Sequence, residues 1–173
     1  MIKILLKESK RNNVICHITG RSGSGKTTLL LKIKELFPMV KILDLDLLDE
    51  ASDRKYDLPT GWKSSDLYSD DLLEKIHAYR QLLLDKFISK NKNIVLAGHH
   101  VEDFTVYNFN ATKRFTLNTP SKIIKKQRMK RDGMSSEDYD TSYEDENFID
   151  GLEGYVKATP VEIIEYIKGY LNV

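Results

Sequence analysis

Short, nearly continuous apolar runs alternate along the chain with longer segments whose apolar residues recur every three or four positions. The short runs predict buried strands of a parallel sheet, and the longer segments predict amphipathic helices. We predict strands over residues 14–19, 40–45, 93–97, 114–117 and 154–158, and helices over residues 27–37, 66–90, 121–131 and from 160 to near the end. This order is typical of an α/β protein with a parallel five-stranded sheet and helices on both faces, in three layers.

Three segments carry no clear period. Residues 1–7 alternate weakly and fit either an edge strand or the first turns of a helix. Residues 49–65 form a polar, irregular stretch, and residues 101–113 hint only at a short helix or turn. Neither a linker nor an internal repeat interrupts the chain, so we expect a single domain over residues 1–173.

The loop after the first predicted strand carries a complete chemical motif. Residues 20–27 read Gly-Arg-Ser-Gly-Ser-Gly-Lys-Thr, which is the G-x-x-x-x-G-K-T of a P-loop and predicts the P-loop NTPase type of fold. Backbone N–H groups of such a loop turn inward around the phosphates of a nucleotide, and the next helix points its positive end at them. Lys26 would reach the β- and γ-phosphates, and the hydroxyl of Thr27 would ligate Mg²⁺. We therefore expect ATP and Mg²⁺ as cofactors, with the nucleotide bound by Gly20, Ser22, Gly23, Ser24, Gly25, Lys26, Thr27 and Thr28.

Two carboxylates follow the second predicted strand. Asp44 and Asp46 stand two positions apart, so in an extended chain both face the same side. They also lie at the carboxyl end of a parallel strand, where such sheets place their ligands. One carboxylate could then hold Mg²⁺ and the other could take the proton from an attacking hydroxyl. The alternative is that one or both only cap the segment that follows.

The predicted helix over residues 121–131 is strongly basic. It carries six cations, whereas residues 137–146 carry six acids and no base. Cations neutralise the charge on a transferring phosphoryl group, so this pattern fits a mobile lid over about residues 121–147, with Arg128 and Arg131 closing on ATP. A solvated charged helix is the alternative. A nucleic-acid surface is a third and weaker interpretation, because no aromatic residue lies within the basic run.

The acceptor of the phosphoryl group is expected to bind the segment between the second and third strands, about residues 46–90. An arginine there would suit a phosphorylated acceptor, and Trp62 either stacks on a base or sugar or anchors its loop. The candidates are Arg54, Lys55, Trp62, Lys63 and Arg80. Gly98, at the end of the third strand, permits close approach to a ligand, and His99 after it either contacts the acceptor or fills the loop.

Composition limits the class of protein. The chain has 173 residues, of which 40% are hydrophobic and 31% charged, as in a globular domain with a real core. A net charge of +1 gives no global field that favours nucleic acid. The single cysteine, Cys16, excludes an internal disulfide and is expected in the core. No signal peptide or membrane span appears, so we expect a cytoplasmic monomer or homodimer without a membrane partner.

Taken together, these motifs resemble the small P-loop kinases, the group of nucleoside monophosphate, shikimate and gluconate kinases. Residues 20–27 match the phosphate loop of that group. Asp44-Leu45-Asp46 is similar to the D-x-D of shikimate-type kinases, in which the first acid is associated with Mg²⁺ and the second with the acceptor hydroxyl. Arg128 and Arg131 resemble lid arginines.

Other parts of the chain follow this group less closely. Gly98-His99-His100 falls where shikimate kinases carry a glycine triplet, and the two histidines argue against shikimate as the acceptor. Residues 158–160 fall where the group packs a loop against adenine. The third strand ends without the D-x-x-G of GTPases and without the acids that motor or AAA-type ATPases usually carry for water activation.

The resemblance implies an ATP-dependent kinase that transfers a phosphoryl group to a small molecule or nucleotide. In that reading Lys26, Asp46, Arg128 and Arg131 are catalytic, and Thr27 with Asp44 positions Mg²⁺. Two alternatives remain: a polynucleotide 5′-hydroxyl kinase whose basic helix follows a strand of nucleic acid, and a nucleotide-binding regulator without transfer activity.

Overall fold

Five strands form one all-parallel sheet in the order β2-β3-β1-β4-β5. The computed structural model describes residues 13–58, 69–98, 107–133 and 154–173. The strands are β1 (Val14–Thr19), β2 (Lys41–Asp44), β3 (Ile94–Ala97), β4 (Ala111–Leu117) and β5 (Val156–Ala158). All six residues of β1 are buried, as expected for the central strand of a sheet covered on both faces. The predicted parallel five-stranded sheet is confirmed.

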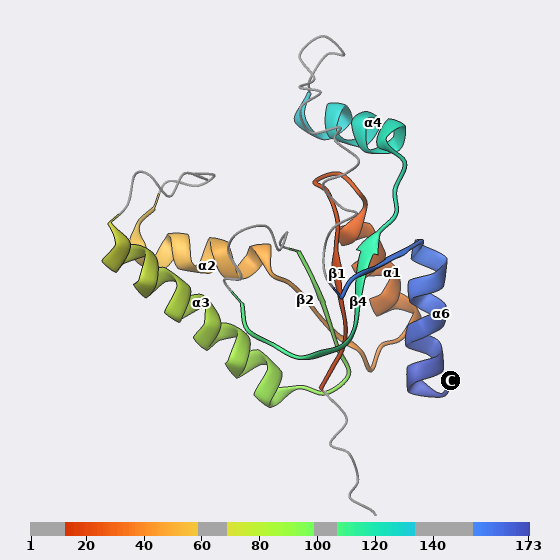
Figure 1. The fold of residues 1–173 in the computed structure, drawn as a ribbon, viewed down its shortest axis with the longest axis horizontal. Helices are drawn as coiled ribbons and strands as arrows, with labels where there is room; N and C mark the ends of the chain where they lie inside the picture. The colour runs from red at the N-terminus through yellow and green to blue at the C-terminus, as the bar shows by residue number, and fades with distance from the viewer. Residues whose placement is uncertain (1–12, 59–68, 99–106, 134–153) are drawn as a thin grey trace, which may run out of the picture.

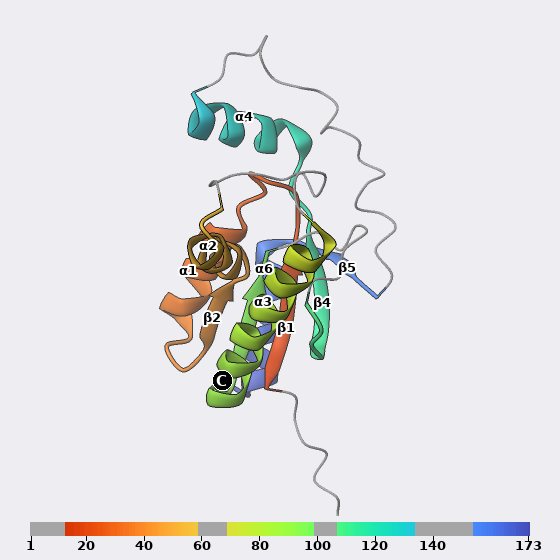
Figure 2. The same cartoon turned by 90° about the vertical axis from the view of Figure 1, so that its left-hand side faces the viewer.

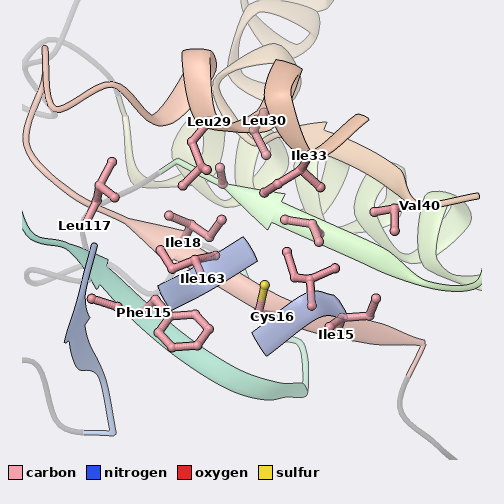
Figure 3. Packing of buried hydrophobic residues seen from close by; sticks show 14 of the residues in the cluster. Ile15, Cys16, Ile18, Leu29, Leu30, Ile33, Val40, Phe115, Leu117 and Ile163 are labelled. Carbon is pink, nitrogen blue, oxygen red and sulfur yellow. The ribbon is translucent and has the colours of Figure 1, made fainter. Parts of the chain in front are cut away.

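Helices cover both faces of this sheet (Figures 1 and 2). The helices are α1 (Lys26–Leu36), α2 (Asp46–Tyr56), α3 (Asp70–Lys90), α4 (Ser121–Asp132) and α6 (Pro160–Leu171). On one face, α1 and α6 bury Ile33, Ile163 and Ile167 against β1 (Figure 3). On the other face, α2 and α3 bury Leu48 and Leu84 against β2 and β3. The three predicted layers are therefore present.

One helix is absent from the sequence prediction. Residues 46–56 form α2, whereas the pattern from residue 49 onward predicted an irregular stretch. Only Leu48 and Ser52 are buried on this helix, and a buried serine hides the apolar period. Asp46 and Asp49 in its first turn favour the helix through the macrodipole. The part of the predicted irregular segment up to Tyr56 is thus a helix with a narrow buried stripe, and residues 59–65 of that segment lie outside the described residues.

The remaining differences concern element ends. Strand β2 stops at Asp44 because Leu45 already has helical angles, φ −65° and ψ −24°. Strand β4 begins at Ala111 instead of residue 114, and its first residues are largely exposed, so they lack an apolar signal. Helix α6 begins as predicted, with a capping box between Thr159 and Glu162.

Helix α4 stands apart from the two helical layers, beyond the carboxyl ends of the strands (Figure 1). It follows β4, and the loop between them touches the P-loop, where Thr119 Oγ1 donates to the carbonyl oxygen of Ser24 at 2.8 Å. The strand order reverses beside β1, which is where open α/β sheets form their ligand crevice. No helix within the described residues is long and apolar enough to cross a membrane.

Candidate functional site

The P-loop connects the central strand to α1. Gly25, with φ +93°, lies directly before the first residue of α1, and Gly23 has φ +80°. Both conformations are ones that a residue with a Cβ rarely adopts. A Cβ on Gly23 would also lie 2.6 Å from Cγ of Arg128 on α4. The glycines therefore shape the loop and let α4 approach it closely.

The side chain of Lys26 folds back onto the P-loop. Its ammonium donates to the carbonyl oxygens of Gly20 at 2.6 Å and Arg21 at 3.1 Å. Burial lowers the pKa of Lys26, while the charges of Asp46 and Asp44 act to raise it and that of Arg131 to lower it. The ammonium is thus held at the loop by acceptors that a phosphate oxygen can replace.

The two predicted carboxylates lie together beside the end of β3. A Cβ on Gly98 would lie 3.0 Å from Oδ1 of Asp44 and 3.3 Å from Oδ1 of Asp46. Burial, followed by the charge of Asp46, raises the pKa of Asp44. The pair spans the change from strand to helix and is not carried by one extended strand. The turn at Leu45, with the backbone N–H of Asp46 donating to Asp44 Oδ1 at 3.3 Å, brings the carboxylates close instead.

Asp44 also faces the residue expected to share a metal ion with it. Thr27 Oγ1 donates to Asp44 Oδ2 at 3.5 Å, so a hydroxyl and a carboxylate meet at the start of α1. These are the hard oxygen ligands that Mg²⁺ prefers, usually together with substrate phosphates. Within the described residues no group of three His, Cys, Asp or Glu side chains could hold a metal by itself. The residues present fit a Mg²⁺ ion that is shared with a nucleotide.

The predicted lid arginines reach the phosphate loop. Nη1 of Arg131 donates to Ser22 Oγ at 3.1 Å, and its Nε and Nη2 pair with Asp132. The side chain of Arg128 packs over Gly23. Residues 134–147 of the expected lid lie outside the described residues. The described part of this segment therefore places Arg128 and Arg131 against the P-loop.

The candidates for acceptor binding do not gather at one place, unlike the carboxylates and the lid arginines. Gly98 lies at the carboxylate pair, whereas Arg80 contacts Ser52, Asp49 and Asp53 between α2 and α3. Arg54 is exposed and pairs with Glu50 at 3.7 Å. Trp62, Lys63 and His99 lie outside the described residues. Among the described candidates, only Gly98 is shown to adjoin the carboxylates of Asp44 and Asp46.

His17 is a site neighbour that the sequence analysis did not identify. This buried histidine of β1 has Nε2 3.0 Å from the carbonyl oxygen of Gly98 and Nδ1 2.7 Å from the hydroxyl of Tyr155. A carbonyl only accepts, so Nε2 donates to Gly98. A histidine within a run that is otherwise mostly apolar was the available signal.

The chain was compared with known protein families and structures. A family model described as AAA domain matches residues 17–149. No curated protein matches the chain in sequence. The strand-end argument against AAA-type ATPases therefore does not exclude membership of the AAA domain family.

Solved structures share the fold at low identity. Protein TT1252 of Thermus thermophilus is 18% identical with a TM-score of 0.60, and the match covers 92% of this chain and 96% of that one. The tunicamycin resistance protein of Deinococcus radiodurans is 14% identical with a TM-score of 0.61, over 92% and 96% of the two chains. A shikimate kinase of Acinetobacter baumannii is 14% identical with a TM-score of 0.48, over 91% and 92%. The chain belongs to the AAA domain family.

Proposed function

We propose that this protein is an ATP-dependent phosphotransferase that moves the γ-phosphoryl group to a hydroxyl or phosphate of a small molecule or nucleotide. The observation that carries the proposal is the meeting of the P-loop with a second carboxylate. Asp44 already has a partner in Thr27, whose hydroxyl donates to it. Asp46 lies beside Gly98, and its negative charge acts to raise the pKa of Lys26. A site that only binds a nucleotide needs no second carboxylate at this position.

On the donor side, the P-loop amides and Lys26 bind the phosphates. Lys26 would leave the carbonyl oxygens of Gly20 and Arg21 and follow the charge on the β- and γ-phosphates. Thr27 and Asp44 would hold Mg²⁺, which neutralises phosphate charge when it is bound. Arg131 and Arg128 approach the same loop from α4 and add positive charge there.

On the acceptor side, Asp46 orients the attacking hydroxyl and accepts its proton. Its place at the first position of α2 fixes the carboxylate at the carboxyl edge of the sheet. Gly98 leaves room at this point because it has no Cβ to press against the two carboxylates. Closure of the lid over both substrates would exclude water and so favour transfer over hydrolysis.

Asp46→Asn tests this proposal with the full chain, ATP–Mg²⁺ and a screen of nucleosides, nucleoside monophosphates and polyols. A positioned general base contributes about 10²–10⁴-fold to a rate, so transfer should fall by that order while ATP binding persists. Asp71→Asn is the matched control, because Asp71 is exposed on α3 and pairs with Lys75 on the same helix.

The outcomes separate the proposed enzyme from its alternatives. Wild-type transfer by Asp46→Asn would remove the assigned role of that carboxylate. ATP binding without any phosphorylated product across the screen would favour a nucleotide-binding regulator. Product formed on an oligonucleotide 5′-hydroxyl, with binding that weakens steeply as salt rises, would favour a polynucleotide kinase.

A further inference from the structure

The first turn of α2 must keep a fixed position if Asp46 is to act on an acceptor. Asp46 is the first residue of α2, and Asp49 follows three positions later, on the same side of the helix. A catalytic group needs its place fixed to within about 0.5 Å, and the side chains that pack around it provide this. The contacts of Asp49 therefore bear directly on the position of Asp46.

Arg80 of α3 holds α2 with its guanidinium. Its Nε donates to Ser52 Oγ at 2.7 Å and lies 3.2 Å from Asp49 Oδ1, while Nη2 lies 3.5 Å from Asp53 Oδ1. Ser52 Oγ donates in turn to the carbonyl oxygen of Asp49 at 2.7 Å. The side chain of Arg80 is only 12% exposed, so solvent screens these charges little. Arg80 thus binds the face of α2 that carries Asp49.

Tyr107 reaches the same carboxylate from a third segment of the chain. Its buried hydroxyl donates to Asp49 Oδ1 at 2.9 Å, the oxygen that also faces Arg80. Burial, followed by the charge of Asp49, raises the pKa of Tyr107, and the charge of Asp46 contributes to the same shift. The hydroxyl therefore keeps its proton as a donor and lies within electrostatic reach of Asp46.

The segment that carries Tyr107 is itself attached to α3. Nε2 of Gln81 donates to the carbonyl oxygen of Asn108 at 2.9 Å, and the backbone N–H of Asn108 donates to Oε1 of Gln81 at 2.7 Å. Gln81 directly follows Arg80 in the chain. One turn of α3 therefore fixes both partners of Asp49, the guanidinium and the tyrosine hydroxyl.

These polar contacts matter because apolar packing holds α2 only weakly. The structure describes all of α2, and Leu48 is the one buried apolar residue within it. Apolar contacts are non-directional, whereas hydrogen bonds and ion pairs have preferred geometry. Rotation of α2 about its axis would move Asp46 relative to Gly98, and the contacts of Asp49 oppose that rotation.

We propose that Arg80 and Tyr107 are positioning residues, which act through Asp49 to hold Asp46 where it meets the acceptor hydroxyl. This inference rests on the proposed phosphotransferase function and adds to it the residues that orient the base. It also assigns Arg80 a place behind α2 instead of the contact with a phosphorylated acceptor that the sequence suggested, because its guanidinium is engaged by Ser52, Asp49 and Asp53.

Tyr107→Phe tests the inference by removing one hydroxyl and keeping the buried ring. The full chain is assayed with ATP–Mg²⁺ and the acceptor that gives most product in the screen described above. We expect kcat to fall about tenfold, because a small displacement of a catalytic group lowers the rate steeply. The Kd of ATP should stay at the wild-type value, since the nucleotide binds at the P-loop.

Tyr56→Phe is the matched control. Tyr56 is the last residue of α2, and its hydroxyl donates to the carbonyl oxygen of Lys75 on α3 at 3.1 Å. This variant also loses one tyrosine hydrogen bond of α2, but at the end far from Asp46, so its kcat should stay at the wild-type value. An equal fall of kcat in both variants, or no fall in Tyr107→Phe, would overturn the positioning role.

Arg80→Lys separates positioning from acceptor binding. Lysine keeps the charge, but one ammonium cannot reproduce the fork that meets Ser52, Asp49 and Asp53 together. We expect a lower kcat with an unchanged KM for the acceptor. An arginine that bound the acceptor in both ground state and transition state would instead raise KM with kcat unchanged, and that result would overturn the inference.

The results distinguish this inference from the function on which it rests. Product formed by the wild type, together with a wild-type kcat in Tyr107→Phe, overturns the inference and leaves the phosphotransferase standing. No phosphorylated product from the wild type with any acceptor in the screen overturns both.

Discussion

Replacement of Gly98 by alanine should disturb the fold and the site at once. Gly98 has φ +110°, a conformation that strains a residue with a Cβ. The added methyl group would lie 3.0 Å from Asp44 Oδ1 and 3.3 Å from both Asp46 Oδ1 and Leu45 Cβ. The backbone cannot move freely to relieve this crowding, because the carbonyl oxygen of Gly98 bonds to the buried His17.

The size of the effect follows from these contacts. Backbone strain at such a position is about 1–3 kcal/mol. For a chain of this length each 1 kcal/mol lowers Tm by about 2–4 °C, so Tm should fall by about 2–12 °C. The carboxylates must also shift by a few tenths of an ångström, which should reduce kcat for transfer more than it weakens ATP binding.

Gly154→Ala is the control for strain alone. Gly154 has φ +80°, but nothing lies within 4 Å of a Cβ built there. Thermal unfolding, nucleotide titration and kcat measured on both variants separate strain from crowding. The reasoning is refuted if Gly98→Ala keeps the wild-type Tm, or if it loses stability like Gly154→Ala with kcat unchanged.

Two predictions concern α6. The backbone N–H and the hydroxyl of Thr159 donate to Glu162 Oε2 at 2.7 and 2.8 Å, and these bonds lower the pKa of Glu162 below its ordinary value of 4.5. The stability that the charged form of Glu162 contributes is therefore complete above pH 4.5 and is lost as pH falls through the lowered pKa. The difference in Tm between wild type and Glu162→Gln should shrink as the pH is lowered. A difference that stays constant from about pH 7 to 2 would contradict this prediction. Gly169 lies exposed within the helix with open space at its Cβ, so Gly169→Ala should raise the free energy of unfolding by about 0.5–1 kcal/mol in urea denaturation, and a lower midpoint would count against it.

The sequence was sufficient for the centre of the sheet because β1 and β3 are buried along their whole length and read as apolar runs. The P-loop could also be recognised from the sequence, because its motif is defined by the spacing of neighbouring residues. Helix α2 was missed because Ser52 occupies a buried position and breaks the apolar period. Contacts between distant residues could not be predicted from the hydrophobic pattern. Arg80 and Asp49, for example, meet because α2 packs against α3. The contact of His17 with Gly98 likewise depends on the register of β1 with β3, which pairs Ile18 with Ala97.

The hydrogen bonds of His17 also bear on the order of folding. Its partners Gly98 and Tyr155 lie 81 and 138 residues away along the chain, whereas only the P-loop separates α1 from β1. Contacts of such separation form only after long loops have closed, and they slow folding. We therefore expect the edge of the sheet at Gly98 to reach its native geometry after β1 and α1 have packed. A mild loss of stability should then open this edge before the core between α1 and α6 unfolds.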